Sequence, residues 1–279
     1  MLADAHLHLF TDGYPGPDGA PMLGPTREID AYNALRATHG IEAGLVVGFE
    51  AGGIDTRNNA YLRELAVENR WIHSVAYVEV APAPTPESVE QLLDQGHVGI
   101  SIYLPDEESG RAVAAWPAGV WDVLGKARAL VSLNARPEAT RAIKPTIERA
   151  RGVDFAFAHL GLPGPAPAEL MPSSAKARLH SLLSLSESPN VFVKISGLYA
   201  VREAAGIDDL RSPEHAYIEV LLQTFGAERC MWGSDFSPVL AHNTFEETLR
   251  IEPVSRLPAG DVEKVMGGTL SYLLQSRRP

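Results

Sequence analysis

The stretch VGISIYLPDEESGRAVAAWPAGVWDVLGKARALVSLN, residues 98–134, contains the unit from which the rest of the chain is built. It begins with an apolar and β-branched run at 98–103, continues into a helix-period segment at 117–129 and ends in a second apolar run at 129–134. A strand, a helix and a second strand in this order are typical of a parallel βαβ unit. The stretch therefore predicts parallel strand pairing.

The same alternation recurs along the whole sequence. Helix-period segments also occupy 58–69, 85–96 and 137–150. Eight strands alternating with helices in 279 residues predict a (β/α)8 TIM barrel, with one domain spanning 1–279. A doubly wound sheet is disfavoured because HLHLFTDG, after the first run, is not a glycine-rich turn. The remaining apolar or β-branched runs are 2–8, 43–49, 72–78, 153–159, 190–196 and 229–235.

Composition bounds the class of protein. Hydrophobic residues make up 45% of the sequence, which suffices for a large core, and the net charge of -11 argues against nucleic acid or an anionic membrane as partner. No apolar run is long enough for a membrane span, and no secretory signal is predicted. The single cysteine, Cys230, excludes an intrachain disulfide and fits a reducing cytoplasm. We expect a small-molecule substrate, and the sequence leaves open whether the chain forms a homo-oligomer.

Loop lengths orient the predicted barrel. The connections that enter strands are short, as at 69–71 and 95–97. Several connections that leave strands are long and rich in glycine and proline, at 11–26, 104–117 and 160–174. Because barrels keep functional residues on the loops after their strands, the site is predicted at the C-terminal rim.

The residues DAHLHL, 4–9, place two histidines near the end of the first predicted strand. Side chains alternate along a strand, so Asp4, His6 and His8 are predicted to share one face. Two imidazoles on one face suit a metal ion or a polar substrate. The alternative is a surface strand with incidental histidines.

Strand parity predicts that polar residues of other strands reach the same end. His6, His8, His159 and Asp235 would then converge, and three imidazoles with a carboxylate suit a divalent ion such as zinc. Taken singly, His159 could be a core histidine, Asp235 a helix cap, and Lys194 the partner of a buried carboxylate. The predicted faces are Ser101 and Tyr103; Ser132, Asn134 and Arg136; Phe155, Phe157 and His159; Phe192, Lys194 and Ser196; Met231, Gly233 and Asp235. The histidines predicted to be structural or at the surface are His39, His73, His97, His180, His215 and His242.

Five motifs lie along the chain: DAHLHLF, FAHLG, NVFVKISGLY, RCMWGSDFSPV and VMGGTLSYLL. Together they resemble the amidohydrolase-related (amidohydrolase 2) branch of the metal-dependent hydrolases. Within this branch, KISGLY together with MWGSDFSP resembles the lactonase group, which includes 2-pyrone-4,6-dicarboxylate lactonase, sulfomuconolactone hydrolase and sugar-acid lactonases. The resemblance implies that His6 and His8 are ligands or substrate contacts, that His159 is the sixth-strand histidine and that Asp235 is the catalytic carboxylate.

The sequence departs from the wider family at two positions. Asn134 stands where many members carry a histidine, so a binuclear metal centre is not expected. Thr269 replaces the asparagine of the C-terminal GGNA pattern, which should affect only helix packing. Since the lactonase group also contains members that act without metal, the resemblance implies one divalent ion, zinc, or none.

The chemistry implied is the hydrolysis of a lactone of a small carboxylated or sugar-acid substrate. Asp235 would take a proton from water and return it to the leaving oxygen. A metal ion on His6, His8, His159 and Asp235 would activate water or the carbonyl; without metal, protonated histidines would stabilise the oxyanion. Candidates for binding the substrate are Arg57, Tyr103, Asn134, Arg136, Lys194 and Tyr199.

Two other functions stay open at this point. A metal-dependent decarboxylase of an aromatic or unsaturated acid would use the same ligands, although Asn134 argues against it. A barrel that only binds a ligand is the third reading, because fold does not fix function.

Overall fold

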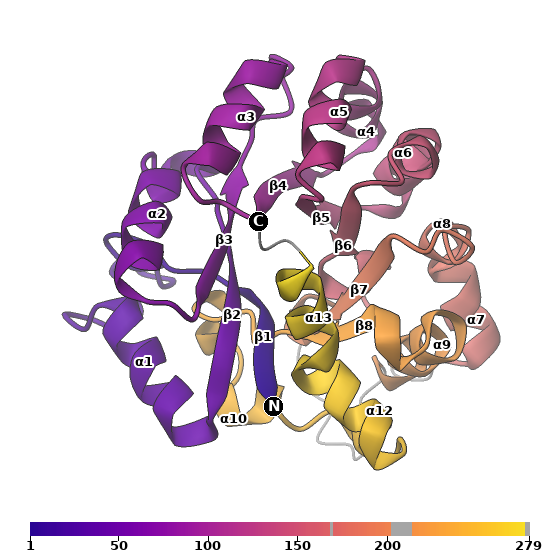
Figure 1. Cartoon of the computed structure of the whole chain (residues 1–279). Coiled ribbons are helices and arrows are strands. Elements are labelled where there is room, and N and C mark those ends of the chain that lie inside the picture. Colours follow the sequence, from indigo (N-terminus) through magenta and orange to yellow (C-terminus); the bar gives the residue numbers. More distant parts are fainter. Residues whose placement is uncertain (168–169, 202–213, 277–279) are drawn as a thin grey trace.

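The computed structural model describes residues 1–167, 170–201 and 214–276, and a parallel eight-stranded sheet lies at its centre (Figure 1). The strands pair in chain order, from β1 to β8. A bridge between Leu7 and Phe236, and a bond from the Asp235 N–H to the His6 carbonyl (2.8 Å), join the last strand region to the first. The predicted (β/α)8 barrel is therefore confirmed. The strands are β1 Leu2–Leu7, β2 Ile41–Val47, β3 Ile72–Tyr77, β4 Gly99–Leu104, β5 Leu130–Ala135, β6 Asp154–Phe157, β7 Val191–Ile195 and β8 Cys230–Trp232.

Helices surround the barrel (Figure 1). The main outer helices are α1 Glu28–His39, α2 Asn58–Glu68, α3 Pro86–Asp94, α4 Glu107–Ala114, α5 Ala118–Lys126, α6 Pro137–Arg149, α7 Pro172–Arg178, α8 His180–Leu183 and α9 His215–Phe225. The C-terminal helices are α10 Phe245–Thr248, α11 Glu252–Ser255, α12 Ala259–Glu263 and α13 Thr269–Gln275. None of the helices in the described ranges is long and apolar enough to cross a membrane.

The structure corrects one of the predicted loops. Residues 104–117 contain helix α4, which starts at a capping box between Asp106 and Ser109. Each side chain of this pair accepts a hydrogen bond from the backbone N–H of the other, so the segment has a strong helix start that its glycine and proline content concealed. The long loop before α1 is present as predicted, and residues 168–169 of the predicted loop 160–174 lie outside the described residues.

The core has an outer and an inner layer. Alternate strand residues such as Val46, Ile102 and Val193 pack outward against the helices. The inward residues of the strand starts pack against α13, which lies across one mouth of the barrel (Figure 1). These inner contacts join Ala3, Leu45, Val75, Leu130, Phe192 and Met231 to Leu270, Leu273 and Leu274. Helix α13 therefore closes the barrel interior on the side opposite the predicted site.

Candidate active site

Asp235 is the centre of a buried cluster at the C-terminal mouth. It lies three residues beyond the end of β8 and is 2% exposed. Its Oδ1 lies 3.5 Å from His6 Nε2 and 3.7 Å from His8 Nε2, and its Oδ2 lies 3.9 Å from His159 Nδ1. The structure therefore brings together the four residues predicted to converge, His6, His8, His159 and Asp235.

Strand β1 reaches this cluster through an irregularity that the sequence did not reveal. The pairing register with β2 shifts between Asp4 and Leu7, so β1 contains one extra residue there. Ala5 packs in the inner layer, whereas the Asp4 carboxylate accepts a hydrogen bond from the Tyr32 hydroxyl of the outer helix α1 (2.8 Å). The prediction that Asp4 shares a face with His6 and His8 is therefore wrong.

His159 also reaches the cluster by a route other than strand parity. Phe155 and Phe157 pack in the outer layer, and β6 ends at Phe157. The backbone then turns, with His159 at φ 51°. Regular alternation would point the His159 side chain outward, toward the helices, but this turn directs it to the mouth of the barrel. The turn depends on Gly197, because a Cβ at that position would lie 2.1 Å from His159 Nδ1.

Burial keeps the first two histidines neutral near neutral pH. Desolvation lowers the pKa of His6 well below its usual value, and the nearby Lys194 lowers it further. Desolvation lowers the pKa of His8 to about 4 despite the opposing charge of Asp235. The expectation that protonated His6 or His8 stabilises an oxyanion is therefore not supported, and each could donate only as a neutral imidazole N–H.

Lys194 lies beneath the cluster. It is completely buried, and its Nζ donates to Ser132 Oγ (2.7 Å) and lies 3.2 Å from His6 Nδ1. Burial lowers the pKa of Lys194 to about 7. Its position therefore favours an effect on His6, rather than the direct contact with a substrate carboxylate that the sequence suggested.

Hydroxyl groups surround the carboxylate. The Tyr199 hydroxyl donates to Asp235 Oδ2 at 2.7 Å. Burial, and then the charge of Asp235, raise the pKa values of Tyr103 and Tyr199, so both phenols stay protonated as donors. Tyr103 pairs with the half-buried Asn134 across β4 and β5. These three predicted substrate contacts therefore line the mouth.

The two predicted arginines lie farther out. Arg57 and Arg136 are exposed and occupy the residues just before α2 and α6, at the rim. In the described part of the chain neither forms an ion pair with an acidic residue. The structure therefore leaves both side chains available at the entrance without placing them beside Asp235.

Sequence reasoning missed several contributors to the site. Ser196 Oγ lies 3.2 Å from His159 Nδ1, and its place on the predicted face of β7 was a usable signal. Tyr14 is close enough to Tyr103 and Tyr199 to raise their pKa values slightly after burial and Asp235 have acted. His242, predicted to be structural or at the surface, stacks on Tyr199 with ring centroids 4.3 Å apart. Loop residues such as Tyr14 and His242 carry no periodicity, so no sequence signal identified them.

The donor set fits one divalent ion. His6, His159 and Asp235 offer ligand atoms within 4.8 Å of one another, and His6 Nε2 is buried without a hydrogen-bond partner. His8 Nδ1 lies 2.8 Å from the Val47 carbonyl, which leaves Nε2 as the ligating nitrogen, the usual arrangement of a metal-bound histidine. If Lys194 is an ammonium, it donates to His6 Nδ1, so the ring proton of the neutral imidazole must lie on Nε2, which then cannot bind a metal ion. A neutral Lys194 can instead accept from Nδ1–H, and this frees Nε2 for a metal ion.

Known proteins share this architecture. The chain is 26% identical to an L-fucono-1,5-lactonase from Burkholderia multivorans, over 96% of this chain and 94% of that protein. A crystal structure of an amidohydrolase from the same species, with bound zinc, matches with a TM-score of 0.75, 23% identity and 99% coverage of both chains. A probable 2-pyrone-4,6-dicarboxylic acid hydrolase from Acinetobacter baumannii, with citric acid bound, matches with a TM-score of 0.73, 17% identity and coverage of 98% and 99%. At these identities the two structures show a shared fold.

The family model described as Amidohydrolase matches residues 3–269. This range contains all four residues of the cluster, from His6 to Asp235. The resemblance seen in the sequence motifs is therefore confirmed. The chain belongs to the amidohydrolase family and is a hydrolase.

Proposed function

We propose that the protein opens the lactone ring of a small sugar acid, with Asp235 as the general base. One observation carries the proposal: a buried carboxylate at the functional mouth faces three imidazoles and accepts a hydrogen bond from Tyr199. A buried carboxylate in a concave, water-restricted site can take a proton from a bound water molecule.

The reaction follows from these groups. Asp235 takes a proton from water as the water oxygen forms a bond to the lactone carbonyl carbon. The tetrahedral oxyanion accepts a hydrogen bond from a phenol at the mouth. When the ring C–O bond breaks, the carboxyl group of Asp235 returns the proton to the leaving alkoxide, and the product is a hydroxy acid. A divalent ion, zinc in our proposal, would be held by His6, His8, His159 and Asp235 and would supply Lewis acidity to the carbonyl or the water.

The lining of the mouth favours an uncharged, hydroxylated substrate. Tyr103, Tyr199 and Asn134 offer hydroxyl and amide groups, whereas the amino group of Lys194 is buried against Ser132 and His6. Sugar hydroxyls both donate and accept hydrogen bonds and match such a lining. The name of the B. multivorans relative, an L-fucono-1,5-lactonase, agrees with this substrate class.

The test is a panel of neutral aldono-1,5-lactones, carboxylated lactones and aromatic carboxylic acids. Release of acid would be followed with a pH indicator, and spontaneous hydrolysis would be subtracted using Asp235→Asn. We expect wild-type protein to open neutral lactones and to yield hydroxy acids. Carbon dioxide release from the aromatic acids would identify a decarboxylase, and inactivity on every substrate would contradict the proposal.

A variant of Arg136 tests whether the protein recognises a carboxylated lactone or a neutral one. If a carboxylated lactone is the better substrate, Arg136→Met should raise its KM roughly 10- to 100-fold, the effect of losing a charge-assisted hydrogen bond of about 1.5–3 kcal/mol. The KM for a neutral lactone should not change. An equal effect on both lactones would show that Arg136 does not recognise a carboxylate.

A further inference from the structure

Asp4 is a buried carboxylate whose function the reaction above does not explain. It is 0% exposed, and four hydrogen-bond donors face it. Its Oδ1 accepts from the backbone N–H of His6 (3.0 Å) and of Ser234 (2.9 Å). Its Oδ2 accepts from the hydroxyls of Ser234 (2.5 Å) and Tyr32 (2.8 Å). Both oxygens are therefore occupied by donors, which leaves no lone pair directed at the active-site mouth.

The donors lie on either side of the residues at the centre of the site. Ser234 directly precedes Asp235, and its hydroxyl also accepts from the Phe236 N–H (3.1 Å). Asp235 itself donates its backbone N–H to the His6 carbonyl (2.8 Å). Through Ser234 and His6, Asp4 therefore contacts the backbone immediately before Asp235 and the strand that faces it.

Asp235 needs such support because of its backbone conformation. Its φ is 59°, in the left-handed region that residues with a Cβ seldom occupy. A residue in this region keeps its conformation only when its surroundings hold it there. The hydrogen bonds of Asp4 and Ser234 contact both neighbours of Asp235, and the Phe236 ring also packs edge-on against the Tyr32 ring, a contact that Tyr32→Phe keeps.

We propose that Asp4 is a positioning residue that holds the left-handed Asp235 and the bulged segment of His6 at their mutual distance. Ser234 connects the Asp4 carboxylate to Asp235, whereas the Tyr32 hydroxyl of helix α1 contacts only the outer side of that carboxylate. The inference rests on the proposed function only for its kinetic consequence, since the geometric consequence holds for any reaction at this site.

Two matched variants separate positioning from general stability. Ser234→Ala and Tyr32→Phe each remove one hydroxyl that donates to Asp4 Oδ2, and both residues are buried. Only Ser234 belongs to the segment that carries Asp235. We expect kcat for the lactone to fall roughly 10- to 100-fold in Ser234→Ala and in Asp4→Asn, with KM changed less than about threefold, because a displacement near 1 Å has effects of this size. Tyr32→Phe should keep kcat within about twofold.

Crystal structures of the three variants provide a readout that needs no substrate. In Asp4→Asn and Ser234→Ala we expect residue 235 to leave φ near 60° or its carboxylate to move away from His6, and in Tyr32→Phe neither change. If Asp235 keeps its wild-type position in both site variants, or if Tyr32→Phe lowers kcat as much as Ser234→Ala, the proposal is wrong. If Asp235 moves but the wild-type protein opens no lactone, the positioning role stands and the proposed reaction fails.

Discussion

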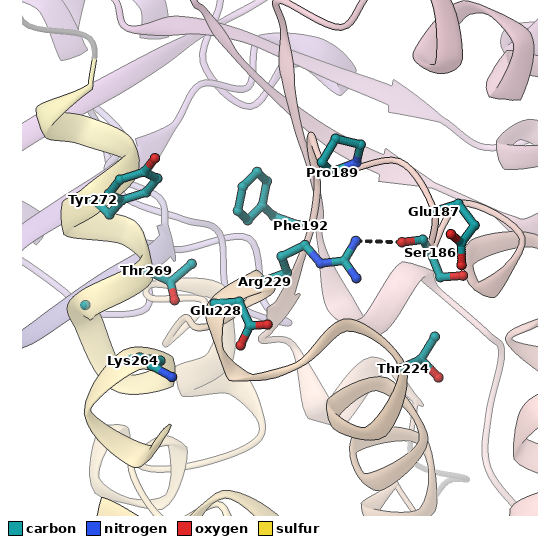
Figure 2. Close-up of a pocket in the computed structure, with 11 residues that line it drawn as sticks. Ser186, Glu187, Pro189, Phe192, Thr224, Glu228, Arg229, Lys264, Thr269 and Tyr272 are labelled. Atoms are coloured by element: carbon teal, nitrogen blue, oxygen red, sulfur yellow. Dashed lines mark hydrogen bonds between the residues drawn. The ribbon is translucent and has the colours of Figure 1, made fainter. Parts of the chain in front are cut away.

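The two ends of the barrel differ in how their polar groups are used. At the N-terminal end, a cavity of about 870 Å³ lies beside α13 (Figure 2). Its lining includes Phe192, Arg229, Lys264, Thr269 and Tyr272. At the C-terminal end, most of the side chains around Asp235 are buried. A cavity of the size found at the N-terminal end would by itself suggest a binding site there.

The hydrogen bonds at the two ends point instead to the C-terminal end as the site. Arg229 in the N-terminal cavity donates to the carbonyls of Ser186 (2.7 Å) and Phe225 (3.0 Å), and Lys264 pairs with Asp261 (2.8 Å). Those cations stabilise the fold where they are. At the C-terminal end, His6 Nε2 is buried without a hydrogen-bond partner, and several titratable groups converge. The comparison teaches that unused, convergent polar groups indicate chemistry better than empty volume does.

The strongest test of this contrast is Asp235→Asn. The amide has nearly the same shape but cannot take a proton, so we expect kcat to fall by about 10²–10⁴, the usual effect of losing an acid–base group. Steady-state kinetics on a confirmed lactone, with thermal unfolding as a check on folding, measures the change. Turnover close to wild type would show that Asp235 only caps the following turn.

Removal of the proposed zinc ion should have the next largest effect. If the site holds zinc as proposed, dialysis against a chelator should lower the zinc content and kcat together, and added zinc should restore both. His6→Ala should weaken zinc binding by roughly tenfold or more, as expected when a buried ligand is lost. Zinc titration by calorimetry measures the affinity without a substrate. Full activity in metal-free protein would place the function in the metal-independent group.

At the N-terminal end, titration should affect stability rather than catalysis. His97 precedes β4, is buried, and its Nδ1 lies 2.8 Å from Ser74 Oγ. Burial lowers its pKa from 6.5 to about 4, with a smaller contribution from Arg63. Between these values the unfolded chain binds more protons, so the free energy of unfolding should fall as pH drops from 6.5 to 4, by about 3 kcal/mol from this group.

Urea unfolding across this pH range, compared with His97→Gln, measures the contribution. The variant should lose that part of the pH dependence, while kcat at neutral pH should stay at the wild-type value. An identical pH dependence in the variant would show that other groups control acid stability.

The smallest expected effect comes from Arg229→Met. The substitution leaves carbonyls of the N-terminal cavity without their charged donor and should lower the free energy of unfolding by about 1–3 kcal/mol. The kcat and KM for the lactone should not change. A large loss of activity in a folded variant would show that the N-terminal cavity also has a role in function.

The sequence predicted most of the fold because the information is local and repeated. Each strand, such as β4 or β5, has its own apolar run, and the connection within each βαβ unit is almost always right-handed. Parity within regular strands also placed Tyr103, Asn134 and Lys194 on inward faces. The burial of Lys194 beneath His6 could not be predicted, because depth in a barrel depends on residues from three different strands.

The local pattern of the chain was therefore enough to predict the barrel, the mouth at which the candidate site lies and the residue types gathered there. The directions of the Asp4 and His159 side chains depend on tertiary contacts. Side-chain alternation holds while a strand is regular, but one extra residue in β1, or a left-handed residue after β6, reverses the face. Such irregularities are stabilised by distant partners, such as Tyr32 and Ser234 for Asp4 and Gly197 for His159, and pairing at that distance leaves no periodic signal in the chain.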